Sequence, residues 1–94
     1  RWRMKVRYTP QARADLDEIF SYVSQDNPPA ASQLIAKIRN NMLTNPSLGR
    51  RGRVAGTREL VIVGYPYIAA YRLHKSTVEV LAVIHTSRSW PDEF

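Results

Sequence analysis

Hydrophobic and charged side chains alternate at the start of the chain, which is the pattern of a β-strand. Within residues 2–8, aromatic or aliphatic residues take every second position, and the positions between them hold Arg3, Lys5 and Arg7. Successive side chains of a strand point to opposite faces of a sheet. One face of this strand is therefore predicted to be buried and the other to be cationic.

The next forty residues follow the period of an α-helix. Thr9 with Pro10 is typical of a helix N-cap followed by proline at the first helical position. Apolar residues then recur at helical spacing over residues 12–23, and residues 26–29 (Asp-Asn-Pro-Pro) end the pattern. Asn27 with Pro28 is predicted to start the next helix. A second apolar stripe covers residues 31–42. Two helices with a short connection are expected to form an antiparallel hairpin.

The second half of the chain contains three short apolar segments, which predict strands at residues 58–63, 67–73 and 78–85. The order is β-α-α-β-β-β. This order predicts an α+β fold in which the helical hairpin packs on one face of a mostly antiparallel four-stranded sheet, while the other face stays open. Residues 1–94 are expected to form a single domain, because the chain is too short for a second core.

An arginine-rich loop precedes these strands. Its arginines occur among glycines that favour irregular backbone, and they are Arg50, Arg51, Arg53 and Arg58. The planar guanidinium group binds phosphate or carboxylate through two hydrogen bonds. The spacing matches no phosphate-loop motif, so a nucleotide pocket of that kind is not predicted. We expect the folded strands to bring this loop, Arg72, His85 and Arg88 towards one region, which would be suited to bind an anion.

His85 is the only titratable group near neutral pH in that expected region. It is expected to share a strand face with Glu79, Leu81 and Val83. In a nuclease it could transfer a proton while arginines stabilise the charged phosphorane. The alternative is a structural histidine, since no acid or second histidine is spaced to assist it. Trp90 is expected either to cover an edge of the core or to stack on a base.

The composition narrows the choice of partners. The net charge is +6, and the excess lies in the two terminal parts of the chain: +4 over residues 1–8 and +3 over residues 46–94, against −1 between them. This distribution suggests a basic surface for an acidic partner, with general solubility as the alternative. The chain has no cysteine, which excludes disulfides, cysteine-ligated zinc and thiol catalysis.

Neither a metal nor another cofactor is expected. The acids Asp15, Asp17 and Glu18 are predicted on the exposed side of the first helix, where they pair more readily with basic neighbours than with a cation. The longest apolar run, residues 60–71, is interrupted by glycine and proline, so no membrane span is predicted. A bacterial cytoplasmic protein is the expectation, and the natural start of the chain is left open because the sequence begins with Arg1.

Three stretches, taken together and in order, resemble the RelE/ParE superfamily of toxins from type II toxin–antitoxin systems, and mostly its ParE side. The resemblance extends over nearly the whole chain, and the stretches that carry it are residues 14–23, residues 45–50 with 56–60, and residues 66–72 with 83–91. The resemblance implies a small cytosolic toxin that forms a hetero-oligomer with a cognate antitoxin. From the basic charge we expect the toxin-binding segment of that antitoxin to be acidic and amphipathic.

The resemblance leaves two cellular targets open. ParE-like members inhibit DNA gyrase and cleave no RNA, so this reading needs no catalytic residue. RelE-like members cleave messenger RNA on the ribosome, and the positions that correspond to their functional residues are Arg58, Arg72, His85 and Arg88. The chain lacks the lysine pair and the C-terminal tyrosine of many RelE-like enzymes, which favours gyrase. A basic nucleic-acid-binding module outside the family is the remaining alternative.

In either case the same side chains are expected to contact the target or the antitoxin. They lie in the arginine-rich loop, on the strands and in the C-terminal tail, and are Arg50, Arg51, Arg53, Arg58, Arg72, Arg88 and Trp90.

Overall fold

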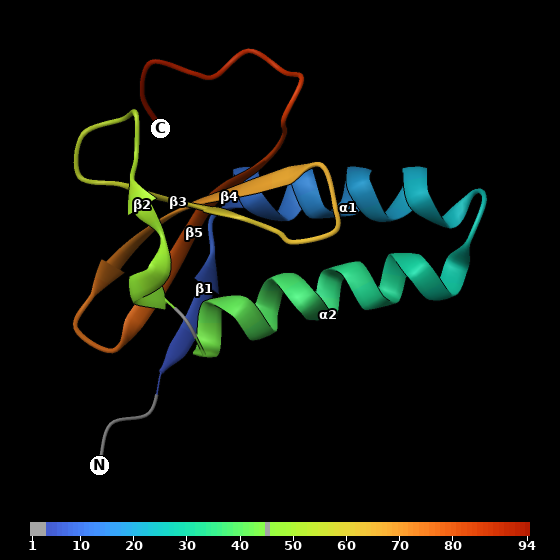
Figure 1. Ribbon diagram of the computed structural model, residues 1–94, viewed down its shortest axis with the longest axis horizontal. Coiled ribbons are helices and arrows are strands. Elements are labelled where there is room, and N and C mark those ends of the chain that lie inside the picture. Colours follow the sequence, from blue (N-terminus) through green and yellow to red (C-terminus); the bar gives the residue numbers. More distant parts are fainter. Residues whose placement is uncertain (1–3, 45) are drawn as a thin grey trace.

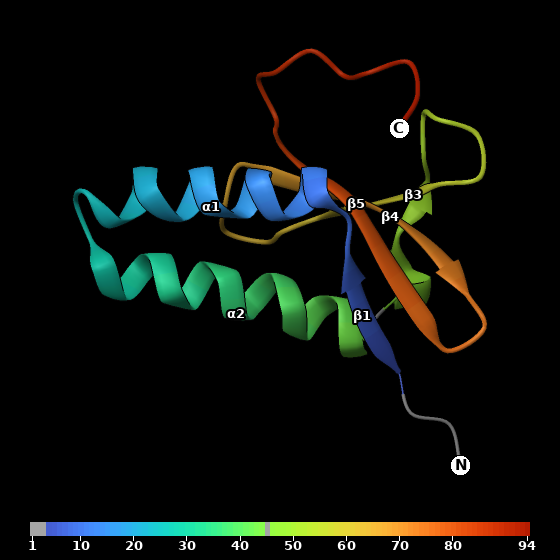
Figure 2. The same cartoon turned by 180° about the vertical axis from the view of Figure 1, so that it is seen from behind.

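A computed structural model describes residues 4–44 and 46–94 of the chain, and it has the predicted α+β architecture (Figure 1). Two helices pack on one face of a sheet (Figures 1 and 2). In chain order the elements are β1 (Lys5–Tyr8), α1 (Pro10–Ser24), α2 (Pro28–Thr44), the 3-10 turn η1 (Pro46–Leu48), β2 (Arg50–Arg51), β3 (Arg58–Val61), β4 (Tyr67–His74) and β5 (Thr77–His85).

Both helices begin where the sequence predicts. The Thr9 hydroxyl accepts a hydrogen bond from the backbone N–H of Ala12 at 3.1 Å, and Pro10 follows as the first helical residue. The side chain of Asn27 accepts in the same way from the N–H of Ala30 at 3.1 Å. These side chains satisfy donors that have no partner within the helix, and thereby fix where each helix starts.

The sheet is mostly antiparallel, as predicted, but it has one strand more than predicted. The described residues form five strands in the order β1-β5-β4-β3-β2, because the pair Arg50–Arg51, predicted as irregular loop, adds a short edge strand. The sheet is mixed: β1 runs parallel to β5, and the other pairings are antiparallel. Apart from β1, the predicted antiparallel arrangement is confirmed.

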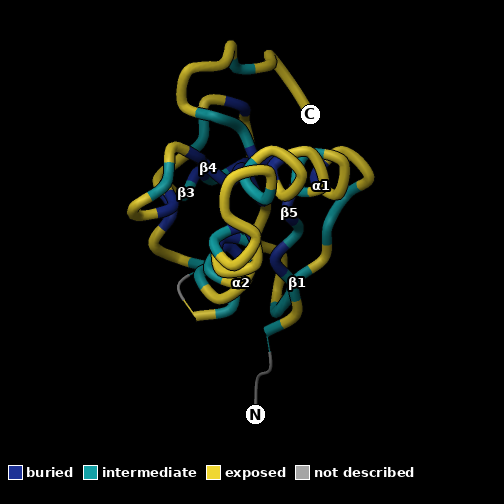
Figure 3. The backbone as a smooth tube through the Cα atoms, turned by 90° about the vertical axis from the view of Figure 1, so that its right-hand side faces the viewer, coloured by how far each residue is buried: buried dark blue, intermediate teal, exposed yellow. Residues whose placement is uncertain are grey.

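The hydrophobic core fills the space between the helices and the sheet. From α2 it contains Leu34, Ile38 and Met42, and from the sheet it includes Tyr71 and Val80, all at 0 % exposure. In Figure 3 the buried stretches lie where the strands and the inward sides of the helices meet, and the outward sides of the helices are exposed. The apolar stripes read from the sequence are therefore the buried surfaces.

A β-bulge interrupts the pairing of β4 with β5. Tyr71 pairs with Val80, but the preceding residue, Ala70, pairs with Ala82, so Leu81 is an extra residue on β5. An extra residue exchanges the two faces for everything that follows it. The expectation that Glu79 shares a face with Val83 and His85 is therefore wrong. Leu81 and Glu79 do line one hollow together.

The sheet face away from the helices is partly covered, contrary to the expectation that it stays open. Ile68, Ala70 and Ala82 point to this side, yet they are only 6 %, 0 % and 3 % exposed. The C-terminal tail, residues 86–94, leaves β5 and arches back towards the loop between β2 and β3 (Figures 1 and 2). A hollow of about 670 Å³ remains between this tail and the sheet.

Neither helix in the described part of the chain is both long and apolar enough to cross a membrane.

Candidate interaction surface

Basic side chains gather on the sheet face away from the helices. Arg7 on β1 lies beside Glu79 on β5, and Glu79 pairs with Arg72 on β4, so these three residues share one face. Glu59 on β3 pairs with Ala70 and with Arg50, which extends the same face to β2. We call the cations of this face the basic face: Lys5, Arg7, Arg50, Arg53 and Arg72. The predicted contribution of Arg3 lies outside the described residues.

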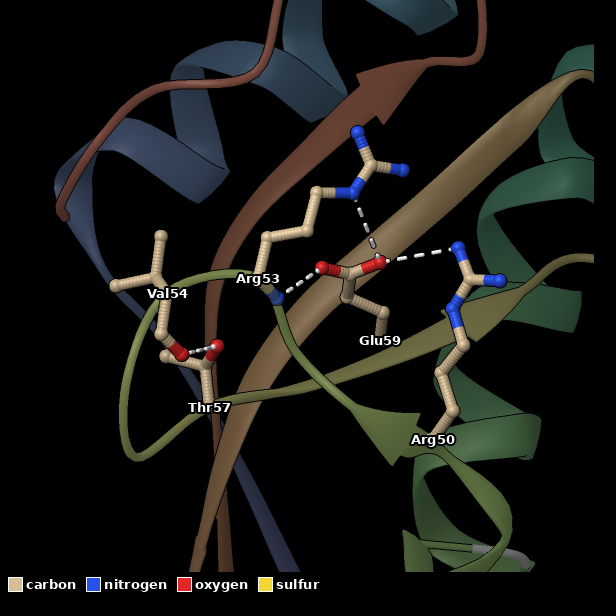
Figure 4. A network of polar contacts seen from close by, with 5 residues as sticks. All are labelled: Arg50, Arg53, Val54, Thr57 and Glu59. Atoms are coloured by element: carbon tan, nitrogen blue, oxygen red, sulfur yellow. Dashed lines mark hydrogen bonds and ion pairs between the residues drawn. The ribbon is translucent and has the colours of Figure 1, made fainter.

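Glu59 lies at the centre of the polar contacts on this face (Figure 4). Its side chain is 1 % exposed, and its Oε1 atom lies 3.1 Å from Nη2 of Arg50 and 3.5 Å from Nε of Arg53. Its Oε2 atom accepts a hydrogen bond of 2.7 Å from the backbone N–H of Arg53. A buried carboxylate requires such partners. No sequence motif predicted a role for Glu59, although it is the only acid between Arg50 and Arg72.

The loop between β2 and β3 is held by its own backbone and side chains (Figure 4). The hydroxyl of Thr57 donates to the carbonyl of Val54 at 2.6 Å, and the N–H of Gly52 donates to the carbonyl of Thr57 at 2.8 Å. A Cβ atom on Gly52 would lie 2.2 Å from Oγ1 of Thr57, so only glycine fits there. The arginines of this loop are therefore presented from an ordered hairpin.

The loop and the C-terminal tail meet through Arg53 and Trp90. The guanidinium carbon of Arg53 lies 4.1 Å from the centre of the Trp90 ring, which is a cation–π contact. The ring of Phe94 meets the ring of Trp90 edge-on at 6.4 Å between centroids. Trp90 was expected either to cover an edge of the core or to stack on a base. In the structure its ring is half-buried and stacks against the guanidinium group of Arg53.

Arg58 does not belong to the basic face, which corrects the expectation that it joins Arg72. It pairs with Tyr71, whose side chain lies in the core on the helix side of the sheet. Its Nη1 atom donates to the carbonyls of Ser47, at 3.3 Å, and Gly49, at 3.1 Å. Arg58 thus ties the strand β3 to the segment that follows α2.

The structure does bring Arg72 and Arg88 together. Both line the hollow between the C-terminal tail and the sheet, and both are exposed. Nη2 of Arg88 lies 2.9 Å from Oε1 of Glu18 on α1, and both side chains of this ion pair are exposed to solvent. Arg88 therefore stands at the rim where the basic face meets the first helix.

His85 lies away from the basic face, and the expectation that it joins Arg72 there is wrong. Because of the bulge at Leu81 it points to the helix side, where its ring meets that of Tyr67 edge-on at 5.3 Å. Tyr67 pairs with His85, and Arg72 lies five residues further along β4, on the order of 17 Å at the usual rise of a strand. Nδ1 of His85 accepts a hydrogen bond of 3.1 Å from the N–H of Ser87.

The surroundings of His85 form a second hollow, of about 260 Å³, at the end of α1. Its polar lining includes Glu18, Tyr67, Ser87 and Arg88. Burial raises the pKa of Tyr67, the Tyr22 and Glu18 charges raise it further, and the Arg88 guanidinium partly opposes them. Tyr67 is therefore a neutral phenol at neutral pH, and the charged residues that line this hollow are Asp15, Glu18 and Arg88.

Tyr71 is a further structural residue that the sequence did not single out. Its hydroxyl donates to the carbonyl of Pro46 and accepts a hydrogen bond of 3.1 Å from the N–H of Gly49. Burial raises the pKa of Tyr71, against the lowering effects of the Gly49 hydrogen bond and of Arg58. The phenol thus fixes the segment that leads from α2 into the arginine-rich loop.

Of the three acids of the first helix, only Asp15 departs from the prediction of an exposed position. Asp15 is half-buried, because its Oδ2 atom accepts a hydrogen bond of 3.0 Å from the backbone N–H of Val83 beside the bulge. Glu18 is paired with Arg88 and Asp17 is exposed. Within residues 4–44 and 46–94, the structure contains no group of three or more metal-ligating side chains that could hold an ion.

Comparison with known proteins places these features in a family. A model of the ParE toxin of the type II toxin–antitoxin system parDE matches residues 6–90. Y4kP of Sinorhizobium fredii, a proposed toxin, is 40 % identical over 92 residues, which cover 95 % of each chain. Toxin RelE2 of Caulobacter vibrioides is 31 % identical over 86 residues, 89 % of this chain and 97 % of the relative.

A solved structure gives the same assignment. A chain of the chromosomal ParDE toxin–antitoxin system from P. aeruginosa superposes with a TM-score of 0.71 at 28 % identity, over 87 % of this chain and 95 % of that one. A chain of the RelBE2 toxin–antitoxin complex from Mycobacterium tuberculosis shares the fold, with a TM-score of 0.66 at 24 % identity, over 89 % and 92 % of the two chains.

Proposed function

The chain belongs to the ParE toxin family of type II toxin–antitoxin systems, and from this premise we propose that it arrests bacterial growth by inhibiting DNA gyrase in the cytoplasm. In this proposal the protein binds another enzyme and blocks its reaction, so it needs a contact surface and no catalytic group of its own. The basic face, together with Arg88 at its rim, is the proposed contact surface.

The observation that carries this proposal is the separation of His85 from Arg72. A ribonuclease of the RelE kind would use His85 beside the arginines, so that one group moves a proton while the others stabilise the phosphate. The bulge at Leu81 turns His85 to the helix side of the sheet, whereas Arg72 lies on the other side. A catalytic set made of these two residues would have to form across the sheet, which argues against it.

We also propose that a cognate antitoxin neutralises the protein. The P. aeruginosa structure comes from a ParDE toxin–antitoxin system, which supports a partner of this kind. Two features of the surface fit an acidic, amphipathic antitoxin segment. The basic face supplies cations, and the helical hairpin leaves apolar side chains at its surface, among them Phe20 at 41 % exposure. Such a segment would fold as it binds.

The second candidate is ribosome-dependent cleavage of messenger RNA. One relative is named toxin RelE2, and the hollow around His85 contains a serine hydroxyl 2.8 Å from Nδ1 of that histidine. These groups could take part in proton transfer without Arg72. Arg88 lines the same hollow and could stabilise a phosphate there.

Expression of the chain without its antitoxin separates the two candidates in living bacteria. Inhibition of gyrase predicts induction of the DNA-damage response and filamentous growth while protein synthesis continues. Cleavage of messenger RNA predicts an abrupt fall in translation before any DNA damage. An abrupt fall in the incorporation of labelled amino acids, without DNA damage, would reject the proposed target.

A further inference from the structure

Two of the arginines in the arginine-rich loop, Arg51 and Arg58, have no acidic partner in the described part of the chain, and the structure places them side by side. Arg51 on β2 pairs directly with Arg58 on β3, so their side chains leave the sheet on the same face. Like charges in directly opposed positions repel each other.

The neighbouring arginines show the contrast. Arg50 and Arg53 share the carboxylate of Glu59, which lies on the opposite face of the same hairpin (Figure 4). Neither Arg51 nor Arg58 forms an ion pair with any described residue. Nη1 of Arg58 donates hydrogen bonds to two backbone carbonyls. Because carbonyls are neutral, these bonds do not compensate the positive charge of Arg58.

Arg51 and Arg58 both line one hollow, of about 530 Å³. Its lining contains no acid within the described chain and consists of Arg51, Gly52, Ala55, Gly56, Thr57, Arg58 and Leu73. The backbone around it is fixed by the hydrogen bonds of Gly52 and Thr57 inside the loop. Gly56 has a φ of 77°, a conformation that favours glycine. The hollow therefore exists before any ligand arrives, which lowers the entropic cost of binding.

We propose that the Arg51–Arg58 hollow is a binding site for a phosphate group. A phosphate carries the charge that this pair lacks, and its oxygens match the forked donors of two guanidinium groups. The site lies apart from the basic face, on the side of the hairpin opposite Glu59. It is independent of whether the cellular target is gyrase or the ribosome.

The phosphate could belong to a free polyphosphate or to the backbone of a nucleic acid. Calorimetric titration of the purified chain with pyrophosphate, and in parallel with a short single-stranded DNA, covers both sources. We expect saturable binding of at least one of them at low salt. If the affinity per phosphate is at least tenfold higher for the DNA than for pyrophosphate, the site binds a nucleic-acid backbone. If the affinity for the DNA is not higher by that factor, the site binds a free phosphate.

Variants decide whether the hollow is the site. Arg51→Gln should weaken binding at least tenfold, because one of the two guanidinium groups is lost. Arg58→Lys should also weaken it, since an ammonium cannot form the bidentate contact, while the charge is kept. Arg39→Gln on α2 is the matched control, because Arg39 is exposed and its loss changes the net charge equally.

The control variant should bind as the wild type does. Equal losses for Arg39→Gln and Arg51→Gln would show that only net charge matters, and would overturn the proposal. Absence of saturable binding by the folded wild-type chain to either probe would overturn it as well. The thermal transition of each variant, measured alongside, identifies any loss of binding that comes from unfolding.

Discussion

The guanidinium group of Arg53 lies 4.1 Å over the ring of Trp90, and its backbone N–H donates to the buried carboxylate of Glu59. One arginine thereby joins three segments: the arginine-rich loop, strand β3 and the C-terminal tail. Elsewhere the tail is attached by the hydrogen bond from the N–H of Thr86 to the carbonyl of Pro66, at 2.9 Å, and by the exposed pair of Arg88 with Glu18. The contact between Arg53 and Trp90 is thus expected to control how firmly the tail lies on the sheet.

Arg53→Gln should loosen the tail, because it removes the cation from the Trp90 ring. A cation–π contact at a partly exposed site contributes about 1 kcal/mol. Backbone amides of residues 89–94 should therefore exchange with solvent several-fold faster, as measured by hydrogen exchange. Arg51→Gln is the control, since it removes the same charge from the same loop without touching Trp90. Equal exchange rates in all three proteins would show that the contact does not hold the tail.

Glu59→Gln should destabilise the fold, because the amide cannot satisfy two guanidinium groups and a backbone N–H equally well. Hydrogen bonds to a charged group contribute about 1.5–3 kcal/mol, and both arginines are half exposed. A loss of about 2 kcal/mol is therefore expected in urea denaturation. Glu93→Gln, at an exposed position of the tail, makes the same change in net charge. It should alter the free energy of unfolding by less than about 0.5 kcal/mol.

Tyr71→Phe should leave the carbonyl of Pro46 and the N–H of Gly49 without their partner. An unsatisfied buried polar group costs about 1–3 kcal/mol, so the free energy of unfolding at neutral pH should fall by that amount. Tyr65→Phe, at a half-buried tyrosine, is a suitable comparison. A change of less than about 0.5 kcal/mol in Tyr71→Phe would contradict the role given to this hydroxyl.

The raised pKa values of Tyr67 and Tyr71 predict a loss of stability in alkaline solution. Tyrosines of the unfolded chain ionise near pH 10, whereas burial keeps these two phenols protonated to higher pH in the folded state. Above that pH the unfolded state binds fewer protons than the folded state, so the free energy of unfolding falls as pH rises. The stabilisation that comes from keeping these two phenols protonated is fully present below about pH 10 and is lost as the pH rises further. A flat stability profile from pH 9 to 11 would contradict it.

Arg72→Ala should reduce toxicity without reducing stability, because Arg72 is exposed on the basic face and its truncation opens no cavity. Colony counts after induction, at equal expression, measure the toxicity, and the thermal transition measures the stability. Lys75→Ala is the control, as an exposed cation in the turn between β4 and β5. Full toxicity of Arg72→Ala would remove Arg72 from the proposed contact surface.

Association with the antitoxin should depend on the charge of the arginine-rich loop. Arg51→Glu is expected to slow association at low salt, since basic residues attract an acidic segment over about one Debye length. The fold should tolerate the change, because Arg51 is exposed. Stopped-flow mixing at low and high salt measures the effect. Unchanged association at low salt would exclude this loop from the recognition of the antitoxin.

Local sequence signals predicted most of the fold. The capping side chains of Thr9 and Asn27 and the apolar stripes define both helices, because these features act within one or two turns of the chain. The short strand β2 was missed, since two arginines have no apolar pattern of their own and pair only because β3 is adjacent. The parallel pairing of β1 with β5 joins the two ends of the chain, which no local pattern specifies.

The candidate site was predicted less well, and one residue explains much of the difference. From the sequence, successive side chains of β5 are predicted to alternate regularly between the two faces of the sheet. In the structure Leu81 is an extra residue in the pairing with β4, and the alternation is interrupted there. The bulge depends on the partner strand and on contacts such as the hydrogen bond from Val83 to Asp15, and these are formed only in the folded chain. Every face assigned beyond that point was therefore reversed, including that of His85.

The most direct test of the proposed function compares two reactions of the purified chain. The first is supercoiling of relaxed plasmid by bacterial DNA gyrase, and the second is cleavage of messenger RNA on programmed ribosomes. We predict that the wild type and His85→Gln inhibit supercoiling in proportion to their folded fractions, and that neither cuts the RNA. Site-specific cleavage of ribosome-bound RNA by the wild type, reduced about a hundredfold in His85→Gln, with gyrase unaffected, would contradict the account.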